Sequence, residues 1–202
     1  MNYRKLIDVG FTRVPKRFQK FPNPLKMLDR LYELPSEPQI KGFRKTTSKD
    51  IPQIYEHLKT FLTKFKVSPL FTQKEVGHLV KPKDNVVYSY VVEDPETKKI
   101  TDFVSWYNIP SSIINHKTHK VLKAAYLYYY FNTKHTLTEL IEDALVEAKK
   151  EDFDVFNCLD ILDNKTFIED LKFGAGDGNL YYYFYNFKTP EVQSNDLGLV
   201  ML

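Results

Sequence analysis

The sequence predicts an α/β fold in which helices flank a mixed β-sheet, in a single domain spanning residues 1–202. Two stretches, residues 51–65 and 137–148, carry apolar side chains at spacings of three and four, the period of an amphipathic helix. Runs rich in Val, Tyr and Phe, which favour strands, alternate with these helices. No repeat, low-complexity tract or linker divides the sequence, so we expect one hydrophobic core.

The N-terminal part is expected to contain a short strand, a short helix and one long helix. Residues 5–11 read as the strand, and residues 25–32 as one or two helical turns that end before Pro35. Ser48 is the predicted N-cap of the long helix. Pro52 suits the first turn of that helix, because an amide proton there would have no partner within the helix.

A β-hairpin is expected next. Residues 86–93 and 100–109 read as its two strands. Residues 94–97 form the turn, and the fixed φ of Pro95 suits its second position. Pro110 and the two serines after it end the second strand.

The following segment predicts a βαβ unit with a parallel strand pair. Residues 121–131 are apolar on both faces, which is typical of a strand inside a sheet. Thr136 and Glu139 have the spacing of a capping box, so a helix is expected to begin there and to continue to Lys150. Residues 154–160 form the second strand, and a helical crossover joins strands that run parallel.

Three glycines fall between a predicted short helix, residues 165–171, and a predicted last strand, residues 180–187. A phosphate-binding loop needs the opposite order, because the helix after the glycines must point its N-terminus at the phosphate. We therefore expect Gly174 to cap the short helix in the left-handed conformation. The spacing leaves two readings of the remaining cluster open, a structural turn and a turn that contacts a ligand through Asp177.

Composition excludes several classes of function. A net charge of +3 is too small to indicate nucleic-acid binding. No run approaches the roughly 20 apolar residues that a membrane span needs, and the start lacks the apolar core of a secretory signal. Cys158 is the single cysteine, so no internal disulfide can form, and we expect a reducing, cytoplasmic location.

Three other features carry weak signals. His116 and His119 could ligate a metal, but no further His or Cys lies close in sequence, so no metal site is expected. Cys158 has no nearby base to activate it, and we expect a buried, unreactive thiol. Lys and Arg are densest over residues 13–20, which read as a solvated loop or as a patch for an anionic partner.

The sequence ends in mostly apolar residues, whereas chain ends are usually polar and frayed. Burying residues 197–202 would carry the α-carboxylate of Leu202 toward the interior, where an isolated charge is costly without donors. Two readings stay open. The tail is an edge strand whose last residue reaches water, or its carboxylate is a base or an amine anchor in a desolvated pocket.

Several segments together resemble the N-myristoyltransferase family, the glycylpeptide N-tetradecanoyltransferases. Residues 172–178, Lys-Phe-Gly-Ala-Gly-Asp-Gly, are similar to the family's KFGxGDG signature. Other similar segments occur in the family's order, namely residues 4–11, 101–103, 122–126, 152–157 and 197–202. The resemblance covers essentially the whole sequence, but only the C-terminal half of the family's protein.

The resemblance implies a fold and a reaction. Family members consist of two acetyltransferase-like (GNAT-like) halves related by a pseudo-twofold axis. They transfer myristate from myristoyl-CoA, a co-substrate and not a bound prosthetic group, to the N-terminal glycine of proteins, without a metal or an acyl-enzyme. The N-terminal half binds myristoyl-CoA and supplies the oxyanion hole, and the C-terminal half provides most of the peptide groove.

The resemblance also implies roles for particular residues. The C-terminal carboxylate of Leu202 would be the general base that takes a proton from the glycine ammonium. Asp177 would face a basic residue a few positions into the substrate. The residues that would bind the peptide are Phe11, Ser111, Tyr126, Asn157, Asp177 and Gly178.

Each of these residues also has a purely structural reading. Phe11 and Tyr126 could simply pack in strands, Ser111 could be a turn residue, and Asn157 a hydrogen-bonded polar residue of the sheet. The half that binds CoA is absent from these 202 residues, so we expect them alone not to catalyse transfer. Two functions lead, the peptide-binding half of an N-acyltransferase and a non-catalytic peptide-binding module. A third hypothesis is a nucleotide-binding domain that uses the glycine cluster, which the absence of a nucleotide-dependent thermal shift would exclude.

Overall fold

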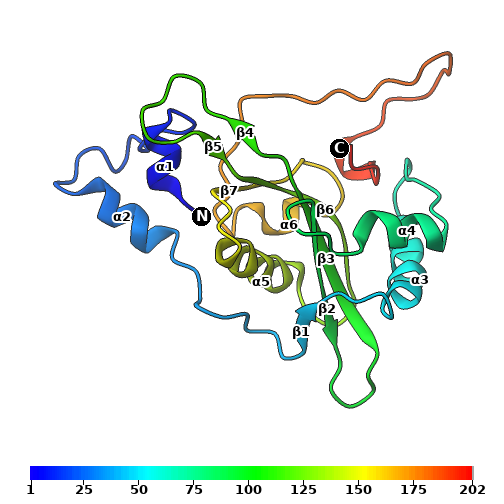
Figure 1. The fold of residues 1–202 in the computed structure, drawn as a ribbon. Helices are drawn as coiled ribbons and strands as arrows, with labels where there is room; N and C mark the ends of the chain where they lie inside the picture. Colours follow the sequence, from blue (N-terminus) through cyan, green and yellow to red (C-terminus); the bar gives the residue numbers. More distant parts are fainter. Residues whose placement is uncertain (202) are drawn as a thin grey trace.

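The computed structural model describes residues 1–201 and is built around a five-stranded sheet of order β1-β2-β3-β6-β7 (Figure 1). Its strands are β1 (Phe43–Lys45), β2 (Val87–Glu93), β3 (Ile100–Asn108), β6 (Ala124–Asn132) and β7 (Val155–Asn157). Neighbouring strands are antiparallel except β6 and β7, which are parallel. A second, two-stranded ladder pairs β4 (Ser111–Ser112) with β5 (Val121–Leu122), so the segment predicted to end β3 forms a short strand of its own.

Helices cover both faces of the sheet. Figure 1 shows α3 and α4 against one face and α5 against the other. The helices are α1 (Tyr3–Asp8), α2 (Pro24–Leu31), α3 (Ile51–Leu62), α4 (Gln73–Val80), α5 (Leu137–Lys150), α6 (Lys165–Ile168) and a single 3₁₀ turn (Ser194–Asp196). None of these helices is long and apolar enough to cross a membrane.

The predicted βαβ unit is confirmed. Thr136 accepts a hydrogen bond from the amide of Glu139, whose carboxylate accepts one from the amide of Thr136 in return. α5 therefore begins at Leu137, as the capping box predicts, and connects β6 to the parallel strand β7. β6 lies between β3 and β7, which explains why it is apolar on both faces.

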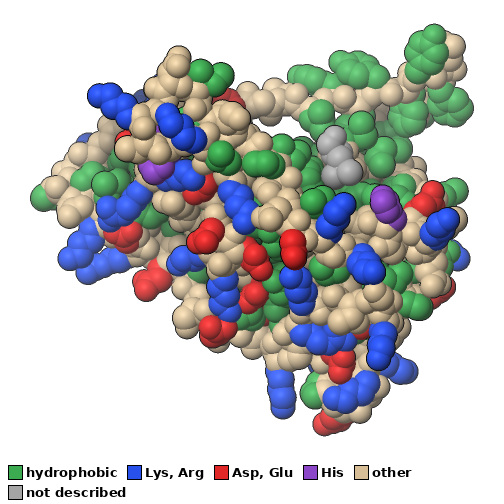
Figure 2. Space-filling view, in the orientation of Figure 1, with side chains coloured by type: hydrophobic (Ala, Val, Ile, Leu, Met, Phe, Trp, Pro, Cys, Tyr) green, Lys and Arg blue, Asp and Glu red, His purple; other side chains and the backbone are tan. Residues whose placement is uncertain are grey.

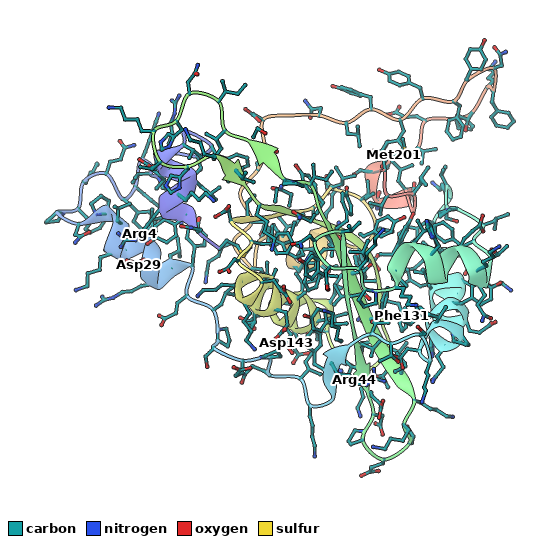
Figure 3. All side chains as sticks on the ribbon, in the orientation of Figure 1. Arg4, Asp29, Arg44, Phe131, Asp143 and Met201 are labelled. Atoms are coloured by element: carbon teal, nitrogen blue, oxygen red, sulfur yellow. The ribbon has the colours of Figure 1, made fainter. Side chains whose placement is uncertain are left out.

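Aromatic side chains fill much of the space between the sheet and the helices. On the α3 side, Phe131 of β6, labelled in Figure 3, stacks on His57 with 5.0 Å between ring centroids. On the other side, Trp106 stacks between Tyr88 and Tyr90 of β2. The predicted hairpin of β2 and β3 is also confirmed, and Asp94 caps its turn by accepting the amides that follow Pro95.

The strand predicted for residues 5–11 is wrong, because this segment is mainly helical. Asn2 accepts a hydrogen bond from the amide of Lys5 and so starts α1. Arg4 pairs with Asp29 of α2 at 2.6 Å between Nη2 and Oδ2, which joins the two N-terminal helices (Figure 3). A short apolar run fits either structure, and here no neighbouring strand offers it a ladder.

The predicted start of α3 is displaced by two residues. Asp50, and not Ser48, occupies the N-cap position, and α3 begins at Ile51. The carboxylate of Asp50 forms an ion pair with Arg44, 2.8 Å away, and accepts the amide of Thr47 (Figure 3). These bonds fix the residues before the helix, so Ser48 lies within a turn.

Two predictions near the glycine cluster are also wrong. Lys172, and not Gly174, adopts the left-handed conformation, with φ of 59°. The amide of Phe173 bonds the carbonyl of Ile168, as it does when a helix ends in this way. The predicted strand over residues 180–187 does not form, because no other strand of the described chain pairs with it.

Candidate active site at the C-terminal segment

The C-terminal segment, residues 197–201, is tied to the body of the fold by its backbone. The amide of Gly198 donates to the carbonyl of Val67 at 2.7 Å, and the carbonyl of Leu197 accepts from the amide of Leu162 at 3.0 Å. A Cβ atom at Gly198 would lie 2.9 Å from the side chain of Phe65, so only glycine lets the segment approach so closely.

Three tyrosine hydroxyls hold the next three residues of this segment, and we call them the tyrosine clamp. Tyr129 accepts the amide of Val200 at 3.1 Å, and Tyr182 donates to the carbonyl of Leu199 at 2.8 Å. Tyr107 donates to the carbonyl of Met201 over a longer distance, 3.4 Å. The tyrosine clamp comes from β3, β6 and the segment before the 3₁₀ turn, so it joins three distant parts of the sequence.

The members of the tyrosine clamp remain neutral phenols at physiological pH. Burial raises the pKa of Tyr129, and it also raises the pKa values of Tyr107 and Tyr182. A neutral hydroxyl can both donate and accept, which matches the amide and carbonyl groups that these residues contact. Val200 is 7% exposed and Met201 49% exposed, so the segment passes from the interior to the surface, where Figure 3 shows Met201.

Leu202, the predicted base, lies outside the described residues. The tyrosine clamp nevertheless fixes the backbone of the three residues before it, Leu199, Val200 and Met201. The sequence did not single out these tyrosines. A signal existed for Tyr129 alone, because a tyrosine in a strand that is apolar on both faces needs a partner for its hydroxyl.

One predicted groove residue, Tyr126, is linked to this segment through Tyr107, and a second, Asn157, is the strand partner of Tyr126. Tyr126 on β6 and Asn157 on β7 are paired in register across the two strands. Tyr126 also stacks on Tyr107, with 5.5 Å between ring centroids. Since Tyr107 also donates to the carbonyl of Met201, the two stacked rings connect β6 to the C-terminal segment.

The other four predicted groove residues lie elsewhere on the surface. Phe11 is in the loop after α1 and is 53% exposed, and Ser111 is exposed in β4. Asp177 and Gly178 belong to an exposed stretch without regular structure. Within residues 1–201, no hydrogen bond connects these four residues to Tyr126 or Asn157.

The glycine cluster has no steric explanation within the described chain. A Cβ atom at Gly174, Gly176 or Gly178 would meet nothing within 4 Å, and none of the three has a positive φ. The sequence argument against a phosphate loop relied on a helix before the glycines and a strand after them. In the described chain the helix is present, but no strand follows the glycines. Both readings of the cluster therefore stay open on this geometry.

His116 and His119 both face Asp8. Their Nε2 atoms lie 3.5 and 3.4 Å from one oxygen of Asp8. Nδ1 of His116 accepts the backbone amide of His119 at 3.0 Å, which fixes the orientation of the His116 ring. In the described part of the chain, no group of three or more His, Cys, Asp or Glu side chains is arranged to hold a metal ion.

Cys158 is a poor candidate nucleophile. Burial raises the pKa of its thiol to about 12, and the nearby carboxylate of Asp160 acts in the same direction. A thiol with this pKa is protonated at neutral pH, whereas the thiolate is the reactive form. The expected unreactive thiol agrees with this environment.

The sequence and the fold of this chain were compared with known protein families, sequences and solved structures. Residues 8–199 match the model of the Myristoyl-CoA:protein N-myristoyltransferase, C-terminal domain. A probable glycylpeptide N-tetradecanoyltransferase of Caenorhabditis elegans is 43% identical over 202 residues, which are 100% of this chain and 44% of the relative. A crystal structure of Saccharomyces cerevisiae N-myristoyltransferase with bound myristoyl-CoA matches with a TM-score of 0.79 and 36% identity, over 88% of this chain and 44% of that chain.

A more distant likeness concerns the fold alone. A Clostridium acetobutylicum protein described as a predicted acetyltransferase with acetyl-CoA matches with a TM-score of 0.54 and 16% identity, over 70% of this chain and 94% of that chain. The expected acetyltransferase-like architecture is therefore confirmed. The chain spans about half the length of the curated relatives it matches. Because the family model covers nearly all of its residues, this chain belongs to the Myristoyl-CoA:protein N-myristoyltransferase family and corresponds to its C-terminal domain.

Proposed function

We propose that this chain is the peptide-binding, base-bearing half of a cytoplasmic glycylpeptide N-tetradecanoyltransferase, with residues 1–202 as one domain. The whole enzyme transfers myristate from myristoyl-CoA to the N-terminal glycine of a protein. The observation that carries the proposal is the tyrosine clamp on the C-terminal segment. A main-chain carboxylate can serve as a catalytic group only if the residues before it are fixed, because misplacement by about 1 Å can cost about a hundredfold in rate.

The carboxylate of Leu202 is the general base in this proposal. An α-amino group titrates near ~7.7–8.0 and an unperturbed α-carboxyl near ~3.3–3.7, so a carboxylate in water is a weak base for such an amine. Removal from water raises the pKa of a carboxylate and narrows this gap. Val200, two residues before Leu202, is buried, and the rings of Tyr107 and Tyr126 stack on each other next to Met201, which supports a partly apolar approach to the end of the chain.

The reaction then proceeds in one transfer. The carboxylate takes a proton from the glycine ammonium, and the free amine attacks the thioester carbonyl of myristoyl-CoA. A C–N bond forms as the C–S bond breaks, and CoA leaves as its thiol with a second proton from the amine. The acyl donor is held by the portion of the enzyme that the relatives carry in addition to this domain.

The peptide would lie over the surface that ends at Tyr107. Tyr126 contributes a ring that stacks on Tyr107, and Asn157 contributes an amide on the neighbouring strand. Phe11, Ser111, Asp177 and Gly178 extend the groove in this proposal, and their exposure leaves them free to contact a peptide. Asp177 is the residue that would bind a lysine near the start of the substrate.

A transfer assay separates this proposal from a non-catalytic peptide-binding module. The portion that precedes the match in the C. elegans relative is joined to Met1 of this chain, and we call the product the joined transferase. We expect the joined transferase to attach myristate to a peptide with N-terminal glycine and not to one with N-terminal alanine. We expect the 202-residue chain alone to bind the glycine peptide without transfer. A folded joined transferase that binds peptide but never transfers would favour the module.

A further inference from the structure

Positive charge is concentrated between α1 and α2. Residues 9–28 contain no Asp or Glu. Their cationic side chains are Arg13, Lys16, Arg17, Lys20 and Lys26. This stretch alone exceeds the net charge of the whole chain, +3, so the rest of the chain carries slightly more negative than positive charge. We call residues 13–26 the basic loop, and Figure 2 shows Lys and Arg side chains gathered over this part of the molecule, at its left.

The five cations of the basic loop are exposed and have no carboxylate partner among residues 1–201. The first acid after them in the sequence, Asp29, pairs instead with Arg4 at 2.6 Å and accepts the hydroxyl of Tyr3. A cation without an internal partner can contact an external anion at no loss of an existing ion pair. The basic loop is therefore a free positive surface of the described chain.

Hydrogen bonds give the basic loop a fixed shape. The amide of Phe18 donates to the carbonyl of Pro15 at 2.8 Å, and the amide of Phe21 donates to the carbonyl of Phe18 at 3.1 Å. The loop then enters α2, whose Leu28 is buried. Because these turns exist before any partner binds, little conformational freedom is lost on association.

Apolar side chains lie among these cations. The rings of Phe18 and Phe21 have centroids 6.4 Å apart, and Phe21 is 46% exposed. The guanidinium of Arg17 lies over the Phe18 ring, 4.7 Å from its centroid. A hollow of about 230 Å³ is lined by Phe21, Pro22, Asn23, Lys26, Met27 and Arg30. The surface thus presents positive charge and apolar area together.

This combination matches the surface of an anionic bilayer. Lys and Arg are attracted to the negative headgroups, while aromatic side chains enter the boundary between headgroups and acyl chains. A nucleic acid fits less well, because the neutral hydrogen-bonding groups that often contact it are already engaged. Gln19 donates to the carbonyl of Val14 at 2.9 Å, and Asn23 accepts the amide of Lys26 to cap α2.

We infer that the basic loop docks this domain on an anionic membrane surface, with its cations at the headgroups and Phe21 at the acyl boundary. Figure 1 shows α2 and the loop before it on one side of the molecule and the C-terminus on the other, so docking leaves the candidate site uncovered. An acyl chain attached at that site would then be released close to a bilayer, and this consequence alone rests on the proposed function. Membrane binding itself does not depend on transfer.

Co-sedimentation of the joined transferase with vesicles, in the absence of myristoyl-CoA, tests the inference. We expect vesicles of phosphatidylcholine with about 30% phosphatidylserine to bind at least about tenfold more tightly than phosphatidylcholine alone. Raising the salt from about 0.1 M to about 0.5 M should release the protein, because salt screens exposed charges. Equal binding to both kinds of vesicle, or binding to neither, overturns the inference.

The same measurement on the 202-residue chain shows whether the basic loop stays uncovered in the longer protein. Binding by the 202-residue chain and not by the joined transferase would mean that the preceding portion covers the loop, which also overturns the inference. Co-expression of the two portions as separate chains gives the same comparison if joining disturbs the fold.

Two triple variants with the same change in net charge locate the membrane-binding surface. The first removes three cations of the basic loop, by Lys16→Gln, Arg17→Gln and Lys20→Gln. The second removes three exposed cations in or next to α3 and α4, by Lys49→Gln, Lys59→Gln and Lys74→Gln. Each cation near an anionic bilayer strengthens binding about fivefold, so the first variant should bind about a hundredfold more weakly and the second less than about fivefold. An equal loss in both would assign binding to net charge and contradict the inference.

A single substitution tests the apolar part of the contact. Phe21→Ala should weaken binding to the phosphatidylserine vesicles by about fivefold or more, because the ring leaves the bilayer boundary. Leu70→Ala is the control, since Leu70 is 97% exposed and lies outside the basic loop. Equal weakening by the two substitutions counts against docking through Phe21. A single-stranded RNA of about 20 nucleotides that displaces the protein from the vesicles and binds more tightly would assign the surface to nucleic acid and overturn the chosen partner.

Discussion

The hydroxyl of Tyr129 accepts a hydrogen bond from the backbone amide of Val200 at 3.1 Å, within the interior and across 71 residues of sequence. This bond joins β6, an interior strand of the sheet, to the C-terminal segment. Val200 is almost completely buried, so no water replaces the hydroxyl if it is removed.

Replacing Tyr129 by Phe should therefore destabilise the domain. The ring is retained, but the buried amide of Val200 loses its partner, which costs about 1–3 kcal/mol in the free energy of unfolding. Urea unfolding of the 202-residue chain measures this difference. Tyr185→Phe removes a hydroxyl from a ring that is 91% exposed, and it should change the free energy by less than about 0.5 kcal/mol. Equal changes in the free energy of unfolding for the two variants would show that the bond between Tyr129 and Val200 does not stabilise the domain.

Gly198→Ala should also destabilise the domain, for a steric reason. The new methyl group would lie 2.9 Å from the ring and Cβ of Phe65, and relief of that contact requires a shift of the C-terminal segment or of the ring. Overpacking of this kind costs about 1–3 kcal/mol. Gly176→Ala is the matched control, since nothing lies within 4 Å of its added methyl group. If both variants unfold at the same urea concentration, the close approach at Gly198 is not a constraint.

Acid should weaken the fold through Asp102. Burial opposes ionisation of this carboxyl, but hydrogen bonds from Thr101, His135 and the amides of residues 133–135 hold its pKa below the usual range. A pKa that is lower in the folded state contributes stability above the unfolded value, about 3.9, and this contribution is lost as the pH falls below it. The free energy of unfolding, measured in urea from pH 7 to pH 2.5, should decrease most steeply below about pH 4.

The variant Asp102→Asn tests the source of this acid dependence. It removes the ionisable group, so the decrease on acidification should become shallower, and stability at pH 7 should fall because the buried amides and His135 lose a carboxylate. Asp84→Asn is the control, since the side chain of Asp84 is 95% exposed. A pH profile of Asp102→Asn that runs parallel to that of the Asp84 variant would assign the acid dependence to other carboxyl groups.

Asp177→Asn should change substrate preference more than overall activity. In the joined transferase, loss of the carboxylate should raise the KM for a glycine peptide with an early lysine by about tenfold, roughly the effect of one charge-assisted hydrogen bond. The KM for a neutral peptide of the same length should stay within about twofold. Steady-state kinetics with the two peptides measures both values. An equal loss for both peptides would make Asp177 a structural residue of the glycine cluster.

Local signals in the sequence were sufficient for the central part of the fold. The capping box at Thr136 and Glu139 fixed the start of α5, and the apolar residues of β6 placed that strand inside the sheet. The errors lie where structure depends on a distant partner. Residues 5–11 and 180–187 have strand-like composition, but a strand needs a neighbour, and neither segment has one in the described chain.

The candidate site shows the same division. The parallel pairing of the strands that carry Tyr126 and Asn157 was predictable from the sequence, but the register that places these two residues opposite each other was not. The tyrosine clamp could not, since its hydroxyl partners are 17 to 94 residues away along the chain. A sequence pattern identifies a buried tyrosine, but it does not identify the group that the hydroxyl bonds.

The most direct test of the account concerns the carboxylate of Leu202. An intein fusion of the joined transferase, cleaved with water or with ammonia, yields enzymes that differ only in a terminal carboxylate or carboxamide. Loss of a general base should lower kcat by at least about a hundredfold. The KM for a glycine peptide should stay within about threefold, because the side chain of Leu202 is retained. A carboxamide enzyme with unchanged kcat would contradict the assignment of Leu202 as the base.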